Sequence, residues 1–147
     1  MTSEMHFDQN GNLPPGLHLM GWQECVSRFG RNDRRESLLA GMLSALHHFQ
    51  DIGCRRVYID GSFVTAKAVP GDYDGCGERT GMDLRRLDVV LRDFSPGRQA
   101  QKTAYGGEWF PATATADSAG QTFPKFFQTD RSGNRKGIVA IDLGEVS

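Results

Sequence analysis

Apolar positions along the chain recur at two periods, one typical of helices and one typical of strands. Between Asp33 and Ile52 they return every three or four residues, which predicts a long helix capped by Asn32 or Asp33 and ended by Gly53. The same spacing predicts three shorter helices, over residues 19–29, 80–94 and 95–105. The last of these is expected to begin with Ser95 as its cap.

Short apolar runs bounded by turn residues predict strands. "RRVYID" (55–60) and "GIVAIDL" (137–143) are the clearest, and "DYD" (72–74) begins or lies on a further strand. "GEWFPATAT" (107–115) is weakly strand-like, and Pro111 places it at a sheet edge or a strand end. Helices followed by mixed strands and helices indicate an α+β fold on a small mixed sheet.

Composition narrows the class of protein. The 147 residues are 38% hydrophobic and 24% charged, which predicts one globular domain over 1–147 with an extended lead-in over 1–16. The net charge of −1 gives no overall attraction to nucleic acid, and the clustered arginines are interpreted as solvated helix faces. Three cysteines without a CxxC pair argue against a disulfide framework or a zinc site. With no secretory signal and no apolar run near the ~18 residues of a membrane span, a cytoplasmic protein is expected.

The stretch "IDGSFVTAKAVPGDYDG" combines residue types that bind phosphate and metal. Alternation along a strand puts Asp72 and Asp74 on one face, where both stay ionised only beside a positive charge. Mg²⁺ or Mn²⁺ is the usual solution, because both prefer carboxylate oxygens. Gly61 allows a sharp turn, and Ser62 adds a hydroxyl beside backbone N–H groups that can bind an anion.

A third acidic residue and a cation are sought elsewhere in the chain. Asp142 is preferred to Asp88, because Asp142 lies within an apolar strand whereas Asp88 lies on a predicted helix beside arginines; an Asp that merely ends a strand is the alternative. Lys67 is a candidate phosphate contact or an exposed loop residue, and Lys136 is a weaker candidate for the same role. The sequence has neither a P-loop nor a GxSxG nucleophile motif.

In order and spacing, Gly61-Ser62 and Asp72-Tyr73-Asp74 resemble the polymerase-beta-like nucleotidyltransferases. From "NLPPGLH" to "FFQTDRSGNRKGIVAIDL" the chain also resembles a small bacterial family of uncharacterised nucleotidyltransferase-like proteins. The resemblance implies that Asp72, Asp74 and Asp142 bind Mg²⁺ or Mn²⁺, with Asp142 also acting as the base. Gly61, Ser62 and Lys67 would bind the phosphates of a nucleoside triphosphate (NTP).

The implied activity is transfer of a nucleoside monophosphate to an acceptor hydroxyl, with release of pyrophosphate. The acceptor is open: tRNA, protein and small molecules all occur among such enzymes, and several are toxins held by an antitoxin or partner chain. The alternative is an inactive nucleotide-binding or protein-interaction module on the same fold, since no clear triphosphate-binding cation follows the core. A purely structural domain would leave the acidic residues unexplained.

Overall fold

A five-stranded mixed sheet organises the structure, a computed structural model that describes residues 7–92, 98–111, 120–130 and 132–145. The strands are β1 (Gly16–Met20), β2 (Arg56–Asp60), β3 (Tyr73–Gly77), β4 (Gly107–Pro111) and β5 (Gly137–Asp142). Their order across the sheet is β1-β5-β2-β3-β4. The β1–β5 and β3–β4 pairs are parallel, and β2 runs antiparallel to both of its neighbours. The predicted α+β fold on a small mixed sheet is confirmed.

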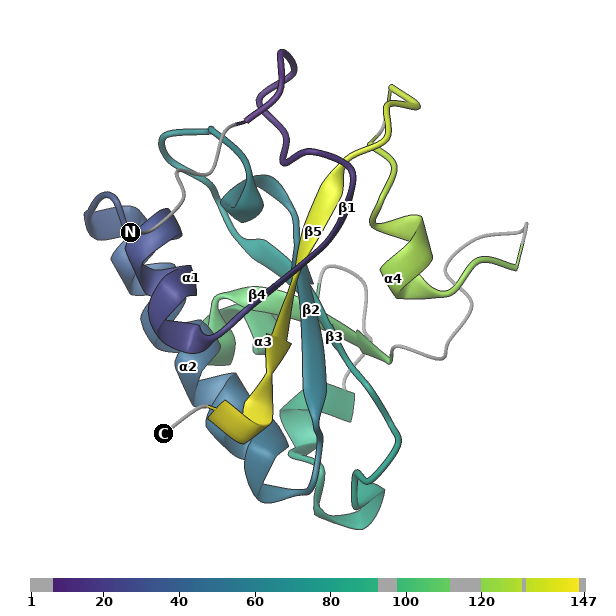
Figure 1. The fold of residues 1–147 in the computed structure, drawn as a ribbon. Helices are drawn as coiled ribbons and strands as arrows, with labels where there is room; N and C mark the ends of the chain where they lie inside the picture. The colour runs from purple at the N-terminus through teal and green to yellow at the C-terminus, as the bar shows by residue number, and fades with distance from the viewer. Residues whose placement is uncertain (1–6, 93–97, 112–119, 131, 146–147) are drawn as a thin grey trace.

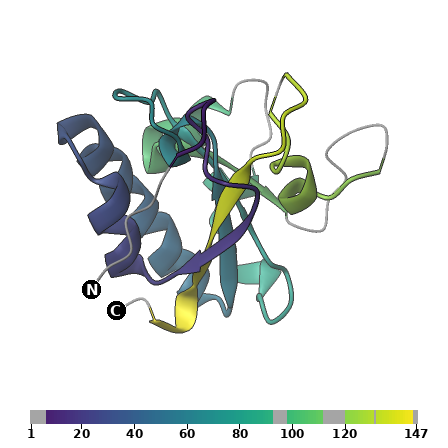
Figure 2. The same ribbon diagram turned by 45° about the horizontal axis from the view of Figure 1, so that its top comes forward.

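Four α-helices accompany the sheet in the described residues: α1 (Trp22–Phe29), α2 (Asp33–Asp51), α3 (Gln99–Tyr105) and α4 (Phe123–Phe126). The helices α1 and α2 cover one face of the sheet, here called the α2 face, and α4 lies against the opposite face, the α4 face (Figures 1 and 2). The helix α3 packs against both α2 and β4. No helix among the described residues is long and apolar enough to cross a membrane.

The two faces have separate apolar layers, which follow from strand alternation. On the α2 face, Val57 and Ile59 of β2 join the large core that α1 and α2 bury. On the α4 face, Tyr58 of β2 and Cys76 of β3 form a smaller layer with Phe127, the residue after α4. Sequence neighbours on one strand therefore point into different layers.

The longest helix follows its sequence pattern closely. The side chain of Asn32 accepts the backbone N–H of Arg35 and caps α2, as the sequence predicts. Leu38, Met42 and Leu46 are almost completely buried along one stripe. The helix ends at Asp51, and Gly53 follows with a φ of 98°.

Two regions differ from the sequence prediction. The segment Gly16–Met20, expected as lead-in and helix start, forms the edge strand β1 against β5. Two short 3₁₀ turns, η2 (Leu84–Arg86) and η3 (Val89–Arg92), replace the helix predicted over 80–94. Short acidic side chains compete for the backbone there: Asp83 accepts the N–H of Arg85, and Asp88 that of Val90.

The start of α3 is a further difference. Arg98 precedes it in the left-handed region, with φ 45° and ψ 45°, and the helix begins only at Gln99. The predicted cap at Ser95 is therefore wrong for this helix, and Ser95 itself lies outside the described residues. Pro111 is the last residue of the edge strand β4, as predicted.

Candidate functional site

The Gly61–Ser62 turn lies directly against Asp74. Strand β2 ends at Asp60, and Gly61 then adopts a φ of 90°, a conformation that side chains other than glycine rarely accept. A 3₁₀ turn, η1 (Ser62–Val64), follows. A Cβ atom at Gly61 would lie 3.2 Å from the Asp74 nitrogen and 3.3 Å from Asp74 Oδ2. The structure thus brings together the two parts of the motif that the sequence separates.

Carboxylates form a row across three neighbouring strands. Asp60 of β2 pairs in register with Asp74 of β3, and Asp74 pairs with Glu108 of β4. Adjacent strands lie about 4.8 Å apart, so each carboxylate has another as its direct neighbour. Asp72 directly precedes β3, with Oδ2 3.7 Å from Lys102 Nζ, and its charge acts on Asp74. We call Asp60, Asp72, Asp74 and Glu108 the acidic row.

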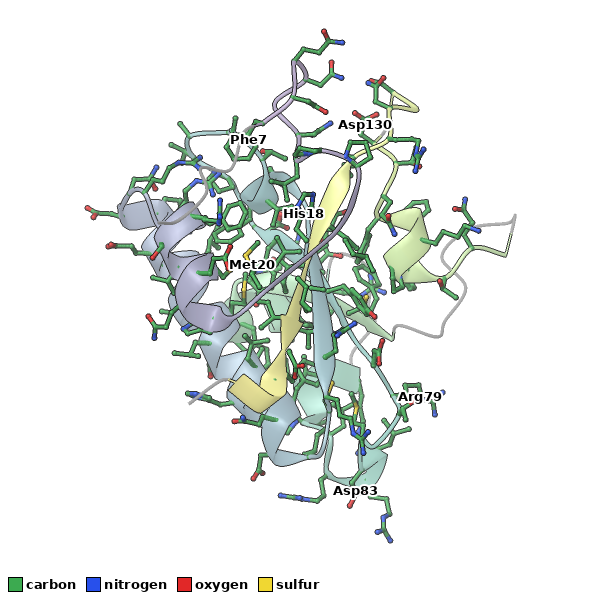
Figure 3. The ribbon with its side chains drawn as sticks, in the orientation of Figure 1. Phe7, His18, Met20, Arg79, Asp83 and Asp130 are labelled. Atoms are coloured by element: carbon green, nitrogen blue, oxygen red, sulfur yellow. The ribbon has the colours of Figure 1, made fainter. Side chains whose placement is uncertain are left out.

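Asp60, Asp74 and Glu108 lie on the α4 face, at one end of the sheet. Asp74 shares its face with Cys76, which belongs to the α4-face layer, whereas Tyr73 between the two aspartates is buried in the α2-face core. The row is at the end where β2 finishes and β3 begins. Figure 3 shows Arg79 and Asp83 at the opposite end, beyond the last residue of β3. The placement of Asp72 on the same strand face as Asp74 stays a prediction, because β3 begins only at Tyr73.

Asp74 is partly buried and has other carboxylates as neighbours. Burial, followed by the charges of Asp60, Asp72 and Glu108, raises its pKa to about 7, although Lys136 acts in the opposite direction. An ionised carboxylate in this position is therefore unfavourable unless a cation joins it. A ligand that brings positive charge would lower the free energy of the ionised Asp74 carboxylate.

Three basic residues surround the row. Lys136, which is almost fully buried just before β5, places Nζ 2.5 Å from Asp60 Oδ1. Lys102 of α3 places Nζ 3.1 Å from Glu108 Oε1 and 3.7 Å from Asp72 Oδ2. Arg98 approaches Glu108 Oε2 at 3.6 Å. Sequence reasoning considered Lys136 but missed Lys102 and Arg98, because their approach depends on where α3 packs beside β4.

The donor set fits a divalent ion that is shared with a substrate. No group of three or more His, Cys, Asp or Glu side chains within the described ranges is arranged to enclose a metal by itself. Mg²⁺ commonly takes only one or two carboxylates and completes its shell with water and substrate phosphates. Asp72 and Asp74, the latter against the Gly61 turn, would meet that smaller requirement.

Asp142 does not belong to this site. It pairs with Arg56 at the start of β2, whereas Asp74 pairs with Asp60 at the end of that strand. Four residues at about 3.3 Å each separate the two positions by roughly 13 Å. Asp142 Oδ1 instead accepts the N–H of Gly144 at 3.0 Å, which is the strand-end role that the sequence left open. The expected place of Asp142 beside Asp72 and Asp74 is therefore wrong, and Glu108 is the carboxylate that lies next to Asp74 on the neighbouring strand.

Asp88 and Lys67 were also considered as site residues from the sequence, and each has other contacts in the structure. Asp88 accepts a hydrogen bond from the Tyr105 hydroxyl at 2.5 Å, which lowers its pKa, and it takes no part in the acidic row. Lys67 is exposed on the loop after η1, and its backbone carbonyl accepts a hydrogen bond from Arg35 at 2.6 Å. A phosphate contact through the Lys67 ammonium stays a prediction.

Arg35 holds the loop that follows the Gly61–Ser62 turn. Its guanidinium is fully buried and lies 5.2 Å from the ring centre of Phe63. It donates hydrogen bonds to the carbonyls of Phe63 (2.7 Å), Thr65 (2.8 Å) and Lys67 (2.6 Å), and also to Phe29 (3.3 Å). Burial lowers its pKa to about 10, with a smaller contribution from Arg31. The interpretation of this arginine as part of a solvated helix face is wrong.

Glu108 is the residue that sequence reasoning should have weighed. It lies in "GEWFP", where Trp109 is buried on the α2 face and Glu108 therefore points to the other face. The available signal was a charged residue in a weak strand directly after a short helix. Its neighbour across the sheet could not be known without the strand order.

The chain also shows similarity to known sequences. Residues 5–142 match a family described as a family of unknown function (DUF6932). The chain belongs to this family. It is also 32% identical over 118 residues to the 1,4-alpha-glucan branching enzyme GlgB of Cupriavidus necator. That match covers 74% of this chain but only 15% of the enzyme, so the chain spans about 15% of the length of this curated relative. No solved structure matches the chain.

Proposed function

We propose that this DUF6932 member is a metal-dependent nucleotidyltransferase. The observation that carries the proposal is the packing of the Gly61 turn against Asp74, at the centre of a carboxylate row across three strands. A phosphate-binding turn and metal-binding carboxylates must adjoin for this chemistry, because one triphosphate contacts both. Sequence spacing alone could not guarantee that contact.

In the proposed reaction, the acceptor hydroxyl oxygen forms a bond to the α-phosphorus of an NTP. The bond from that phosphorus to the β-phosphate oxygen breaks, pyrophosphate leaves, and the hydroxyl proton passes to solvent or a basic group. A bound Mg²⁺ or Mn²⁺ would supply charge neutralisation at the triphosphate. Asp72 and Asp74 would hold it, with Glu108 in the place that the sequence assigned to Asp142. The backbone at Gly61 and Ser62 would bind the phosphates, and Lys102 and Lys136 lie close enough to the row to offset their charge.

A nucleotide-binding module without transfer activity is the second candidate. Lys102 favours it, because its ammonium already lies between Asp72 and Glu108, where a cation is required. Such a module would bind nucleotide in a metal-dependent way and leave it intact. The acceptor (tRNA, protein or small molecule), a cytoplasmic location and a toxin-like role with an antitoxin partner all remain proposals.

A labelling assay tests the function. Purified protein with Mg²⁺ or Mn²⁺ is incubated with each α-³²P-labelled NTP and a bacterial lysate. The Asp72→Asn/Asp74→Asn double variant is the negative control, and Asp142→Asn is the matched control outside the acidic row. We expect a labelled RNA, protein or small molecule with wild type and Asp142→Asn, and none with the double variant.

Two results would count against transfer. Label that persists in the double variant would assign the activity to another site or a contaminant. An absence of label with every NTP, in folded protein that still binds nucleotide with metal, would establish the binding module instead. Nucleotide binding is measured by calorimetry under the same conditions.

A further inference from the structure

A polar cavity opens between α2 and α3 beside the acidic row. Its volume is about 530 Å³, within the range of sites that hold small organic ligands. Figure 1 shows α2 and α3 on the same side of the sheet, and the two helices are in contact. The residues that give the cavity its chemistry are Arg34, Ser37, Gly41, Asp72, Lys102 and Thr103.

The cavity and the acidic row share a wall. Asp72 and Lys102 line the cavity and also belong to the charge network around the row, with their side chains 3.7 Å apart. Lys102 extends from this wall to Glu108 at 3.1 Å. The strand carboxylates of the row face the α4 side, so a molecule with its phosphates over them would reach the cavity by passing Asp72 and Lys102 at the end of the sheet.

The floor of the cavity is closed by a tight helix contact. A Cβ atom at Gly41 would lie 2.4 Å from the carbonyl oxygen of Tyr105, so glycine is what lets α2 and α3 meet there. A Cβ atom at Gly106 would lie 3.3 Å from Leu38, which is buried beneath the cavity. The space is a slot, closed where the helices touch and bordered by Lys102 on the side of the row.

The lining offers hydrogen-bonding groups to a polar ligand that bears hydroxyls. Lys102 is paired with Asp72 and Glu108, and Arg34 adds a guanidinium to the lining. Arg34 is fixed by hydrogen bonds to the carbonyls of Pro70 (3.1 Å) and Gly71. The hydroxyls of Ser37 and Thr103 are exposed along opposite helices. We infer that this cavity binds the nucleoside part of an NTP, whose phosphates lie over the acidic row; the placement of the phosphates rests on the proposed function.

Filling the slot tests this inference without requiring catalysis. Ser37→Trp on α2 and Thr103→Trp on α3 place a large ring in the cavity from exposed helix positions. Ala40→Trp and Ala100→Trp are matched controls on the same helices, at exposed positions outside the lining. The probes are the α,β-methylene analogues of the four NTPs with Mg²⁺, and binding is measured by titration calorimetry.

We expect each cavity variant to weaken binding of the preferred analogue at least tenfold, while both controls stay within about twofold of wild type. Amide spectra provide a second readout: with the analogue, or with the matching free nucleoside, the N–H signals of Gly41, Gly71 and Gly106 should shift. Shifts confined to Gly61 and Gly75, or unchanged affinity in both cavity variants, would overturn the inference. So would the absence of any nucleotide binding.

The two proposals fail in different ways. If nucleotide binds and the cavity variants weaken it, but no acceptor is ever labelled, the cavity assignment stands and transferase activity does not. If labelling occurs while Ser37→Trp and Thr103→Trp leave nucleotide affinity unchanged, transfer stands and the nucleoside lies elsewhere. Circular dichroism and melting temperature establish that each variant is folded before either conclusion is drawn.

Discussion

Replacing Asp74 by asparagine should stabilise the metal-free protein while removing its metal binding. The carboxylate is half-buried between Asp60 and Glu108, and its pKa is raised to about 7 from an ordinary 3.8. That difference corresponds to about 4 kcal/mol of unfavourable interaction of the ionised form. Because water screens part of it, we expect the Asp74→Asn variant to gain about 2 kcal/mol in unfolding free energy at pH 8.

The size of this stability difference depends on pH. Below pH 4 the carboxyl is protonated in both folded and unfolded chains, so it contributes no pH dependence. Between about pH 4 and pH 7 the folded chain keeps its proton while the unfolded chain loses it, and this group therefore lowers wild-type stability as pH rises. The asparagine variant lacks this contribution. The stability difference between the two proteins should open across that window and then stay constant.

Urea unfolding followed by circular dichroism measures the difference, in EDTA, at pH 4, 5.5 and 8. Asp142→Asn serves as the control, because Asp142 pairs with Arg56 rather than with another acid. A gap that is the same at pH 4 and pH 8, or a less stable Asp74→Asn at pH 8, would refute the reasoning. Saturating Mn²⁺ at pH 8 should raise wild-type stability by about 2.7 kcal/mol at one hundred times its Kd, and leave Asp74→Asn unchanged.

Three further substitutions test the other parts of the site. Arg35→Met should lower the unfolding free energy by about 3–5 kcal/mol in urea melts, because the carbonyls of the loop over residues 63–67 lose their hydrogen-bond donor. A loss below 1 kcal/mol would contradict the role of Arg35 in holding this loop. Gly61→Ala should lower the unfolding free energy by about 1–2 kcal/mol because of the positive φ, as measured by urea melts. It should also weaken Mn²⁺ binding through the added contact with Asp74, as measured by electron paramagnetic resonance on the same protein. In the same resonance titration, Glu108→Gln should weaken Mn²⁺ binding at least tenfold while Asp142→Asn does not, and the reverse order would restore Asp142 as the third carboxylate.

Sequence patterns correctly predicted the features that depend on interactions between residues close together in the chain. The apolar stripe of α2 and its Asn32 cap both depend on residues a few positions apart. The 80–94 segment has a helical apolar period as well, but the side chains of Asp83 and Asp88 capture nearby N–H groups, and two 3₁₀ turns form instead.

The remaining parts depend on strand order and on distant partners. Asp142 and Glu108 are both acidic residues in strands, and only the antiparallel pairing of β2 with β5 carries the first away from Asp74. Arg35 resembles its arginine neighbours in sequence, yet the carbonyls that hold it come from a loop about thirty residues later. No periodicity in a single sequence encodes such contacts.

The position of β5 bears on how the site matures during synthesis. This strand is the last of the five along the chain, yet it lies between β1 and β2 in the sheet. Asp60, Asp74 and Glu108 are therefore synthesised before β5, the strand that completes their sheet. Lys136, the close partner of Asp60, arrives with that strand. The acidic row thus receives this counter-charge only after β5 has been synthesised, so a shorter nascent chain would carry the acidic residues without the intact site.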